Sequence, residues 1–373
     1  MQINNTQLKK AVALLNTATK TFSFLEHKKY EYQIKITQID NLLILTLKGR
    51  NGSMVSTTVD IYSGGIENFV VELSELKKMA NFITRKENNI EIENNVLLAR
   101  SGDKNCQIEL TDTNKYEEYL STYYDDEYSP TNEAIATISI EKKDSDNFIK
   151  SLRGMVPLKT KYYSNFGSIF IDGDTVASTD RKRIHTFKFK GKIEDGFKLF
   201  FNQDVCKLIH LFEGERFDIT FEREKSGIRI CISNKNKKIS LLDDMGSMSA
   251  ISIKTLTEMV ARHSENNNLT QFTLSKDVLK VLKSVLPFAN KETCKIDLLS
   301  MGRQLFARYG DATVLLGCSD RDSQCNIPIN CKHLIDAVAP ITGEVTLNYY
   351  KNNSPIVIKG GVSTNLVSSL KWY

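Results

Sequence analysis

The sequence predicts an α+β protein built from a repeated unit, in which one helix is followed by several short antiparallel strands. Segments with the apolar period of a helix recur at intervals of about 56 to 72 residues, and the stretches between them alternate apolar and polar residues as strands do. Two polar, aperiodic segments, at residues 121–132 and 262–268, divide the six units into pairs. We therefore expect three similar domains at residues 1–128, 129–262 and 263–373, each with two helices packed on antiparallel sheets.

Each predicted helix places apolar residues on one stripe. The six helices begin near Gln7, Leu73, Lys143, Gln203, Ser275 and Cys331. In the second, Leu73, Leu76, Met79, Ala80 and Ile83 share one face. The first helix precedes strand-like segments at residues 30–36, 42–47 and 56–61, and the second precedes segments at 90–92, 96–99 and 107–110. Residues 254–261 have the pattern of an additional helix just before the second polar segment.

Composition indicates a globular protein without a membrane segment. The chain has 373 residues, of which 41% are hydrophobic, and a formal net charge of +5. The first ten residues are polar, and no apolar run is long enough to span a bilayer, so we expect a cytoplasmic protein. The cysteines form no CxxC pair, which predicts reduced thiols rather than a zinc site. We expect no cofactor. They are Cys106, Cys206, Cys231, Cys294, Cys318, Cys325 and Cys331.

Basic side chains recur on the predicted helices. Lys276, Lys280 and Lys283 follow one another at i, i+4 and i+7, opposite an apolar face. The other helices contribute Lys9, Lys10, Lys77, Lys78, Lys150, Arg153, Lys207 and Lys332. On any one helix such residues indicate a solvated face. Six helices that present amines to a shared surface would instead bind phosphates without reading the base sequence.

A basic cluster lies between two strand-like segments in the middle of the chain. Residues 167–171 and 186–189 have strand character, which predicts an exposed turn at residues 178–182. Taken alone, Arg181, Lys182 and Arg183 are typical of a solvated hairpin tip.

Residues 178–184, STDRKRI, resemble the "ATDGHRLA" motif of the bacterial sliding clamp family, the beta subunit of DNA polymerase III. Shorter similarities to this family extend over nearly the whole chain. They lie at residues 99–102 and 106–108, 286–292, 327–339, and 366–373. In the last of these, a serine pair replaces the family's apolar-proline step, Lys371 replaces arginine, and Trp372 enlarges the wall of the implied pocket. The "FPDY" segment is absent near residues 245–249, and the family pattern has extended chain where residues 254–261 look helical.

The resemblance implies three clamp domains that close as a head-to-tail homodimer around double-stranded DNA and tether a DNA polymerase. A DNA polymerase and a clamp loader are the implied protein partners. The implied partner-peptide pocket comprises Thr179, Arg181, Lys182, Arg183, Ile184, Pro355, Leu366, Val367, Ser368, Leu370, Lys371 and Trp372. Cys106, Ile108 and Phe288 are the implied dimer interface, and Lys159, Lys161, Tyr162 and Tyr163 correspond to a loop that touches DNA. Most clamps are acidic, so the positive net charge is a departure from the family.

Catalytic interpretations find little support. Carboxylates cluster in predicted turns or linkers, where acidic residues are common, at residues 125–127, 172–174 and 243–244. The histidines lack metal-ligand spacing, and no phosphate-binding glycine motif is present. We therefore predict a protein that is not an enzyme. Two alternatives remain, a monomeric clamp-fold regulator or decoy that binds replication partners, and a metal-dependent nuclease that uses Asp172 or Asp174.

Overall fold

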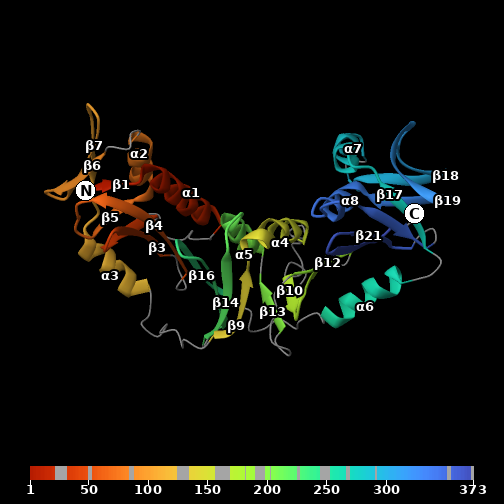
Figure 1. Cartoon of the computed structure of the whole chain (residues 1–373), viewed down its shortest axis with the longest axis horizontal. Helices are drawn as coiled ribbons and strands as arrows, with labels where there is room; N and C mark the ends of the chain where they lie inside the picture. The colour runs from red at the N-terminus through yellow and green to blue at the C-terminus, as the bar shows by residue number, and fades with distance from the viewer. Residues whose placement is uncertain are drawn as a thin grey trace. The chain divides into compact units, whose positions relative to one another are not determined.

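The computed structural model places most of the chain in helices and strands, and Figure 1 shows their order. The described residues are 1–21, 32–48, 53–83, 88–123, 134–155, 169–180, 182–189, 198–201, 203–224, 227–243, 253–265, 269–289, 292–350 and 354–370. Two compact units are present. The first comprises Met1–Ser139, Lys207–Phe212 and Arg216–Ser247, and the second comprises Ile140–Cys206, Glu213–Glu215 and Met248–Tyr373.

The first unit contains a long antiparallel sheet. Its strands are ordered β5-β2-β3-β4-β16-β15-β14-β9, and β1 pairs with β4. Their bounds are β1 (Gln2–Ile3), β2 (Gln33–Ile39), β3 (Leu42–Lys48), β4 (Met54–Ser63), β5 (Phe69–Glu72), β9 (Ala134–Ile140), β14 (Phe217–Glu224), β15 (Gly227–Ser233) and β16 (Lys237–Asp243). Alternate residues of β4 are buried, as expected for a strand with one face on a core.

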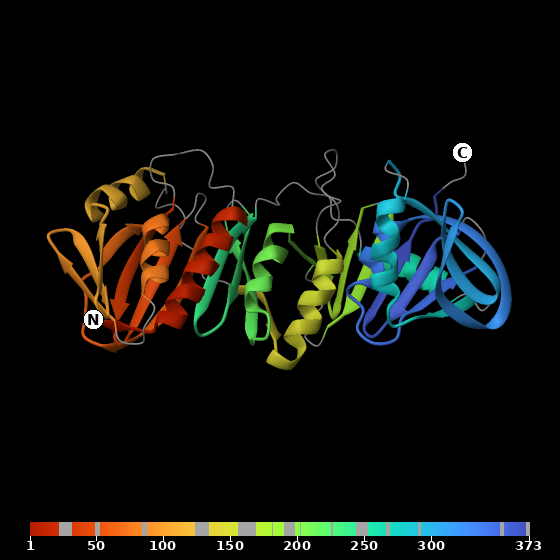
Figure 2. The same ribbon diagram turned by 90° about the horizontal axis from the view of Figure 1, so that it is seen from above.

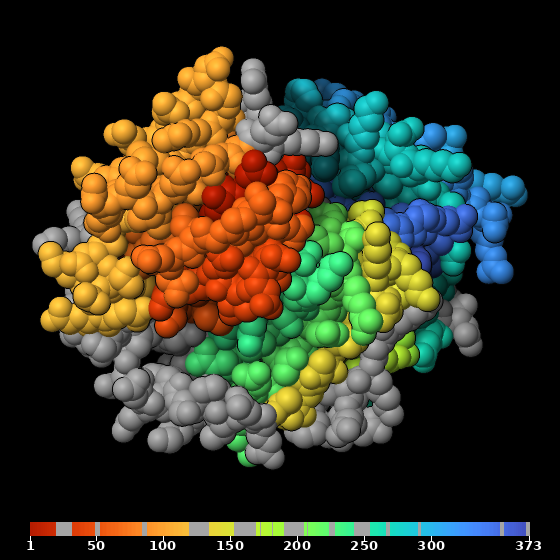
Figure 3. Space-filling view, turned by 60° about the vertical axis from the view of Figure 1, so that its left-hand side comes forward, coloured from red at the N-terminus to blue at the C-terminus, as the bar shows by residue number. Residues whose placement is uncertain are grey.

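Two helices of the first unit lie side by side, α1 (Asn5–Thr21) and α2 (Leu73–Phe82) (Figure 2). They bury apolar residues at helical spacing, among them Leu8 and Leu15 of α1 and Leu76 of α2. A separate sheet is formed by β6 (Asn89–Glu93), β7 (Val96–Ser101) and β8 (Lys104–Glu109), and it is followed by α3 (Thr113–Tyr123). The atoms of these strands reach the surface in orange at the upper left of Figure 3. In this sheet β8 is an edge strand.

The second unit is organised around one antiparallel sheet ordered β13-β10-β11-β12-β22-β21-β20-β17-β19-β18. Its strands are β10 (Ile169–Asp172), β11 (Thr175–Thr179), β12 (Arg183–Lys188), β13 (Lys198–Phe201), β17 (Thr270–Leu274), β18 (Lys295–Tyr309), β19 (Ala312–Asn330), β20 (Thr346–Tyr349), β21 (Ile356–Gly360) and β22 (Ser363–Val367). Pairing of β12 with β22 joins segments that are far apart in the sequence. The strand β18 is the last in the order, so one of its edges is unpaired within the described residues.

Four helices of this unit lie against the sheet or against one another. They are α4 (Lys142–Met155), α6 (Ile253–Ser264), α7 (Val278–Val285) and α8 (Cys331–Val338). In Figure 1, α4 and α8 lie on one side of β12 and β21, and α6 lies on the other. The ring of Phe148 on α4 packs edge-on against Phe187 of β12. One further helix, α5 (Gln203–Ile209), continues as a 3₁₀ turn at His210–Phe212 and divides its residues between the two units.

The α+β fold with antiparallel sheets is confirmed, and all six predicted helices are present. The pattern at residues 254–261 is also a helix, α6. Helix α3 was not predicted, because residues 113–123 are mostly polar. Tyr116 is the buried side chain among residues 113–118, the part of this helix whose side chains the structure describes. The division into three domains stays a prediction. No helix among the described residues is both long and apolar enough to cross a membrane.

Candidate functional site

The residues that resemble the clamp motif lie where β11 turns into β12, beside β22. Ile184 of β12 pairs with Thr179 of β11 and with Leu366 of β22, whereas Arg183 pairs with Val367. Directly opposed residues of an antiparallel sheet share a face, and consecutive residues point to opposite faces. Thr179, Ile184 and Leu366 therefore lie on one face of the sheet, and Arg183 and Val367 lie on the other.

Arg183 lies on the same side of the sheet as α8, and its charge is paired there. Its side chain is 3% exposed and donates from Nε to Asp180 Oδ2 at 3.0 Å. Its Nη1 donates to Asp336 on α8. Asp180 also accepts hydrogen bonds from the backbone N–H groups of Lys182 and Arg183, at 3.0 and 3.1 Å, which close the turn. The interpretation of Arg183 as part of a solvated hairpin tip is wrong, because two carboxylates hold it inside the protein.

The predicted turn is also shorter than expected. Ser178 and Thr179 belong to β11 and are buried, so the exposed turn at residues 178–182 is wrong for these two positions. The Thr179 hydroxyl donates to the carbonyl of Arg183 at 2.8 Å, which ties the two strand ends together. Lys182 is exposed, as a turn residue is expected to be.

His333 of α8 faces the same charged cluster. Its backbone N–H donates to the side chain of Asn330, the residue that caps the helix, at 3.1 Å. Burial lowers the pKa of the His333 imidazole from its ordinary value, and the positive charge of Arg183 lowers this pKa further. Neutral imidazole is therefore favoured beside the paired guanidinium.

The opposite face of the same strands carries a row of apolar side chains, one from each of five neighbouring strands. This apolar row consists of Phe170 of β10, Ala177 of β11, Ile184 of β12, Leu366 of β22 and Val357 of β21. Helix α6 crosses all five strands and adds Leu256 and Val260 to the cluster. Ile184 and Leu366, which were predicted to line the partner-peptide pocket, are only 5% and 4% exposed as a result.

The remaining residues predicted for the pocket lie near the end of β22 or outside the described residues. Ser368 donates its backbone N–H to the carbonyl of Lys182 at 2.9 Å, and Leu370 donates to Pro328 at 2.7 Å. Ser368, Leu370 and Pro355 are half-buried, and Val367 is fully buried in the core beside α8. Arg181, Lys371 and Trp372 lie outside the described residues. The structure thus brings Thr179, Ile184 and Leu366 together, and it places Arg183 and Val367 on the far face.

The lysines predicted to contact DNA are mostly exposed where the structure describes them. The exposed ones are Lys9, Lys10, Lys78, Lys150, Lys276, Lys280, Lys283 and Lys332, and Lys77 is half-buried. Lys276 lies in the turn before α7, because the helix begins at Val278 rather than near Ser275. Lys78 pairs with Glu75 at 2.5 Å on α2. Arg153 and Lys207 belong to α4 and α5, but nothing further of their side chains is described, and Lys159, Lys161, Tyr162 and Tyr163 lie outside the described residues.

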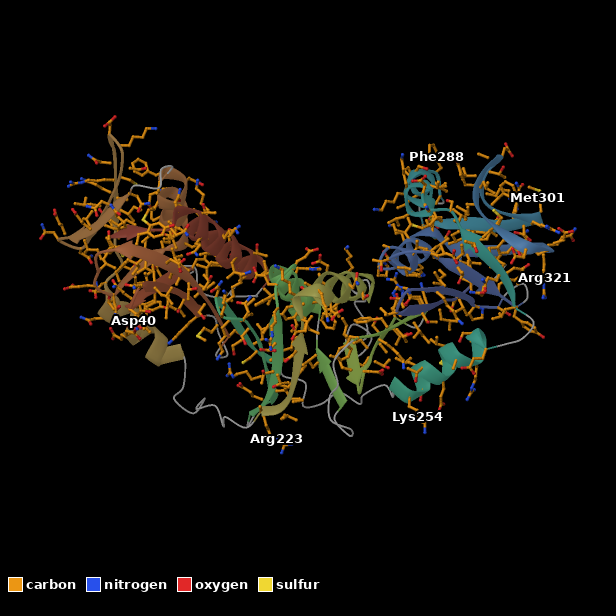
Figure 4. The ribbon with its side chains drawn as sticks, viewed as in Figure 1. Asp40, Arg223, Lys254, Phe288, Met301 and Arg321 are labelled. Atoms are coloured by element: carbon orange, nitrogen blue, oxygen red, sulfur yellow. The ribbon has the colours of Figure 1, made fainter. Side chains whose placement is uncertain are left out.

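The three residues predicted for the dimer interface differ in accessibility. Phe288 is 69% exposed in the 3₁₀ turn that follows α7, and Figure 4 labels it. Its ring stacks on that of Tyr309, with centroids 5.5 Å apart. Cys106 of β8 is half-buried. Ile108 of β8 is only 2% exposed, so its side chain belongs to the interior of the first unit.

The carboxylates weighed for catalysis do not form a metal site within the described residues. Among these residues, no three His, Cys, Asp or Glu side chains lie close enough to hold a metal ion. Asp174 instead pairs with Lys188 at 3.4 Å on the surface. Residues 125–127 and Asp244 lie outside the described residues.

Two features of the site had no usable signal in the sequence. Asp336 is one acidic residue on a short helix, and nothing in its spacing links it to Arg183, which precedes it by 153 residues. The contact of α6 with the apolar row was also missed. The i, i+4 pair of Leu256 and Val260 predicts a helix with a narrow apolar face, but it does not say which strands that face meets.

Comparison with known proteins identifies the fold. No protein-family model matches the sequence, and no curated protein matches it in sequence. The structure is similar to that of DNA polymerase III subunit beta from Borrelia burgdorferi, with a TM-score of 0.77, 14% identity and 98% of each chain covered. It is also similar to the beta subunit from Thermotoga maritima, with a TM-score of 0.71, 14% identity, and coverage of 100% of this chain and 99% of that one.

A third similar structure is the Helicobacter pylori beta clamp bound to a DNA ligase peptide. Its TM-score is 0.69 at 13% identity, with 96% of this chain and 98% of that chain covered. The chain therefore has the beta-clamp fold over its full length, as the sequence resemblance implied.

Proposed function

We propose that this protein is a DNA sliding clamp, a non-enzymatic ring of two copies that encircles duplex DNA and tethers a replicative polymerase. The observation that carries the proposal is the match of the whole chain, rather than of one domain, to beta subunits of DNA polymerase III. A ring stays on DNA through its topology, so it needs only a basic lining that does not read sequence.

Two strand edges support assembly from copies of the chain. Strand β8 ends the three-stranded sheet of the first unit, and β18 ends the sheet of the second unit, each unpaired on one side within the described residues. Unpaired edges are the natural place for one chain to extend the sheet of another. Two different surfaces that meet in this way form a heterologous contact, which closes a ring when the rotation between copies permits.

Assembly is tested at Phe288, which lies near β18 through its stacking on Tyr309. Phe288→Asp removes an exposed aromatic anchor and adds a charge. We therefore expect the dissociation constant of the dimer to rise by at least about 30-fold. Sedimentation velocity gives the mass. Tyr62→Asp is the matched control, because Tyr62 is 59% exposed on β4, away from both edges. A wild-type mass of one chain at micromolar concentration would contradict the ring and favour the monomeric regulator.

DNA encirclement is tested by retention on nicked circular DNA and by loss of that retention when the circle is cut. Replacing Lys276, Lys280 and Lys283 with Glu should weaken retention on every sequence. It should also reduce the slope of log K against log salt by about 3, because three phosphate contacts are removed.

A matched variant separates this effect from net charge. Lys188, Lys235 and Lys238 are exposed and lie on strands or turns, and their replacement with Glu changes the net charge by the same amount. We expect this control to retain DNA nearly as wild type does. Equal losses in both variants would mean that net charge alone governs binding and that no lining exists.

A further inference from the structure

Helix α6 covers the face of the sheet that carries Ile184 and Leu366 of the predicted partner-peptide pocket, and we call this apolar surface the partner groove. Two residues that the groove requires, Ile184 and Leu366, belong to the apolar row and are covered by Leu256 and Val260 of α6. The row receives one side chain from each of five adjacent strands, so it is continuous across β10, β11, β12, β22 and β21. An amphipathic helix laid into an apolar groove is a common mode of peptide recognition.

We propose that α6 is a built-in occupant of the partner groove, and that a partner binds by displacing it. This inference rests on the proposed function, because it concerns the same groove. Helix α6 then regulates access to the groove. The net binding free energy of a partner is its own binding free energy minus the free energy needed to displace α6.

The apolar contact of α6 with the sheet is small, so the helix can leave the sheet as a unit. Among the α6 side chains that the structure describes, residues 254–264, Leu256 and Val260 are buried, and Lys254, Glu258, Met259 and Arg262 are exposed. Lys254 points away from the strands (Figure 4). Elements with few buried apolar contacts open at lower free energy than the core around them.

The groove defines the chemistry of the partner that fits it. Leu256 and Val260 are separated by one helical turn, so the displacing segment needs two aliphatic residues at i, i+4. At the carboxyl end of α6, Lys359 donates its Nζ to the carbonyl of Ser264 at 3.3 Å. A partner helix is therefore favoured if it ends in an acidic side chain or a free carboxylate at this lysine.

Hydrogen exchange on the wild-type protein tests whether α6 opens. We expect the amides of α6 to exchange at least about 100-fold faster than those of α8, through an opening that leaves the strands protected. Exchange of α6 at the same rate as α8 would make it a fixed part of the core and would overturn the proposal. This measurement does not depend on DNA or on dimer formation.

A peptide with the sequence of residues 253–264 tests the groove itself. In the full-length variant Leu256→Asp/Val260→Asp, α6 no longer covers the row, so a labelled peptide should bind at least 10-fold more tightly than it binds wild type. The variant Met259→Asp alters an exposed residue of the same helix and should bind the peptide as wild type does. A peptide that carries the same two aspartates should bind none of the three proteins.

Two outcomes would overturn the inference. If the peptide binds all three proteins equally, uncovering the apolar row does not affect peptide binding, and the row is not the site at which a partner competes with α6. A double variant that fails to fold, judged by the loss of its cooperative thermal transition, would show that α6 is structural. If peptide binding behaves as expected but the protein neither dimerises nor stays on circular DNA, the covered groove stands and the sliding-clamp function fails.

Discussion

The two faces of the strands around β12 are covered by helices that are held in different ways. On one side, α8 buries six of its eight residues, and Asp336 pairs with Arg183 of β12. The side chain of Asn365 also donates to the carbonyl of Ala337 at 2.7 Å. On the other side, α6 meets the sheet through Leu256 and Val260. Alternation along the strands produces this difference, because Arg183 and Ile184 are neighbours in sequence and point to opposite faces.

The comparison shows that two helices on opposite faces of one sheet are held by contacts of different extent. Burying two aliphatic side chains stabilises α6 by about 3 to 6 kcal/mol before the cost of ordering the helix is subtracted. Helix α8 buries more apolar side chains and adds hydrogen bonds and an ion pair, so its removal opens the interior. We expect variants on the two sides to separate accordingly.

The largest effect is expected on the α8 side, at Arg183. In Arg183→Ala, the carboxylate of Asp180, which is 5% exposed, loses its buried partner. Breaking a buried pair from one side costs about 3 to 5 kcal/mol, because the remaining charge is uncompensated. Urea denaturation should show this loss, and Lys182→Ala, an exposed neighbour, should change stability by less than about 0.5 kcal/mol. A loss of the same small size in Arg183→Ala would mean that water reaches this pair.

A pair of leucines compares the two helices directly. Leu334 of α8 and Leu256 of α6 are 1% and 4% exposed, so the two truncations to Ala remove equally buried groups. Leu334→Ala should cost about 2 to 5 kcal/mol of unfolding free energy. Leu256→Ala should cost no more than about 2 kcal/mol of unfolding free energy. Once α6 has left the sheet the rest of the protein stays folded, so the loss of stability cannot exceed the free energy of opening α6.

Non-additivity provides the check on this explanation. If the loss stops at opening, Leu256→Ala/Val260→Ala should be barely less stable than Leu256→Ala alone. The pair Leu334→Ala/Leu282→Ala, in the core between α8 and α7, should lose more than either single variant. If Val260→Ala instead lowers the unfolding free energy as much in the Leu256→Ala background as it does in the wild type, both helices are parts of the core and the proposed difference between them is wrong.

The sequence predicted the elements of the fold better than the environment of the site. Strand and helix periods depend on neighbouring residues, so the β11–β12 hairpin and all six predicted helices could be expected from local patterns. Resemblance of residues 178–184 to a known motif placed Ile184 and Leu366 near each other, and the structure pairs them. Basic residues beside a turn are usually solvated, and this general tendency led to the wrong prediction that Arg183 is exposed.

The missing information was long-range. The burial of Arg183 depends on Asp336, and the covering of Ile184 depends on α6, both of which approach only when the sheet is complete. Intrinsic patterns carry no record of such contacts, because any acidic residue or any amphipathic helix satisfies the same local rule. The sequence is only 13% to 14% identical to beta subunits of known structure. The family pattern predicted extended chain at residues 253–264, where the structure has helix α6.

The smallest expected effect is the pH dependence contributed by His333, and it belongs to the α8 side alone. The pKa of this imidazole is lowered in the folded protein, chiefly by burial and then by the charge of Arg183, whereas the unfolded chain keeps the ordinary value of 6.5. The unfolded state therefore binds more protons below about pH 6.5, so stability falls as the pH drops from that value toward the lowered folded pKa. One proton sets an upper limit of about 1.4 kcal/mol per pH unit. In His333→Gln, the unfolding free energy should depend less steeply on pH across this window, and Leu256→Ala should keep the wild-type slope. Unchanged steepness in His333→Gln, measured by urea denaturation from pH 7 to pH 5, would mean that groups other than His333 determine the pH dependence of stability.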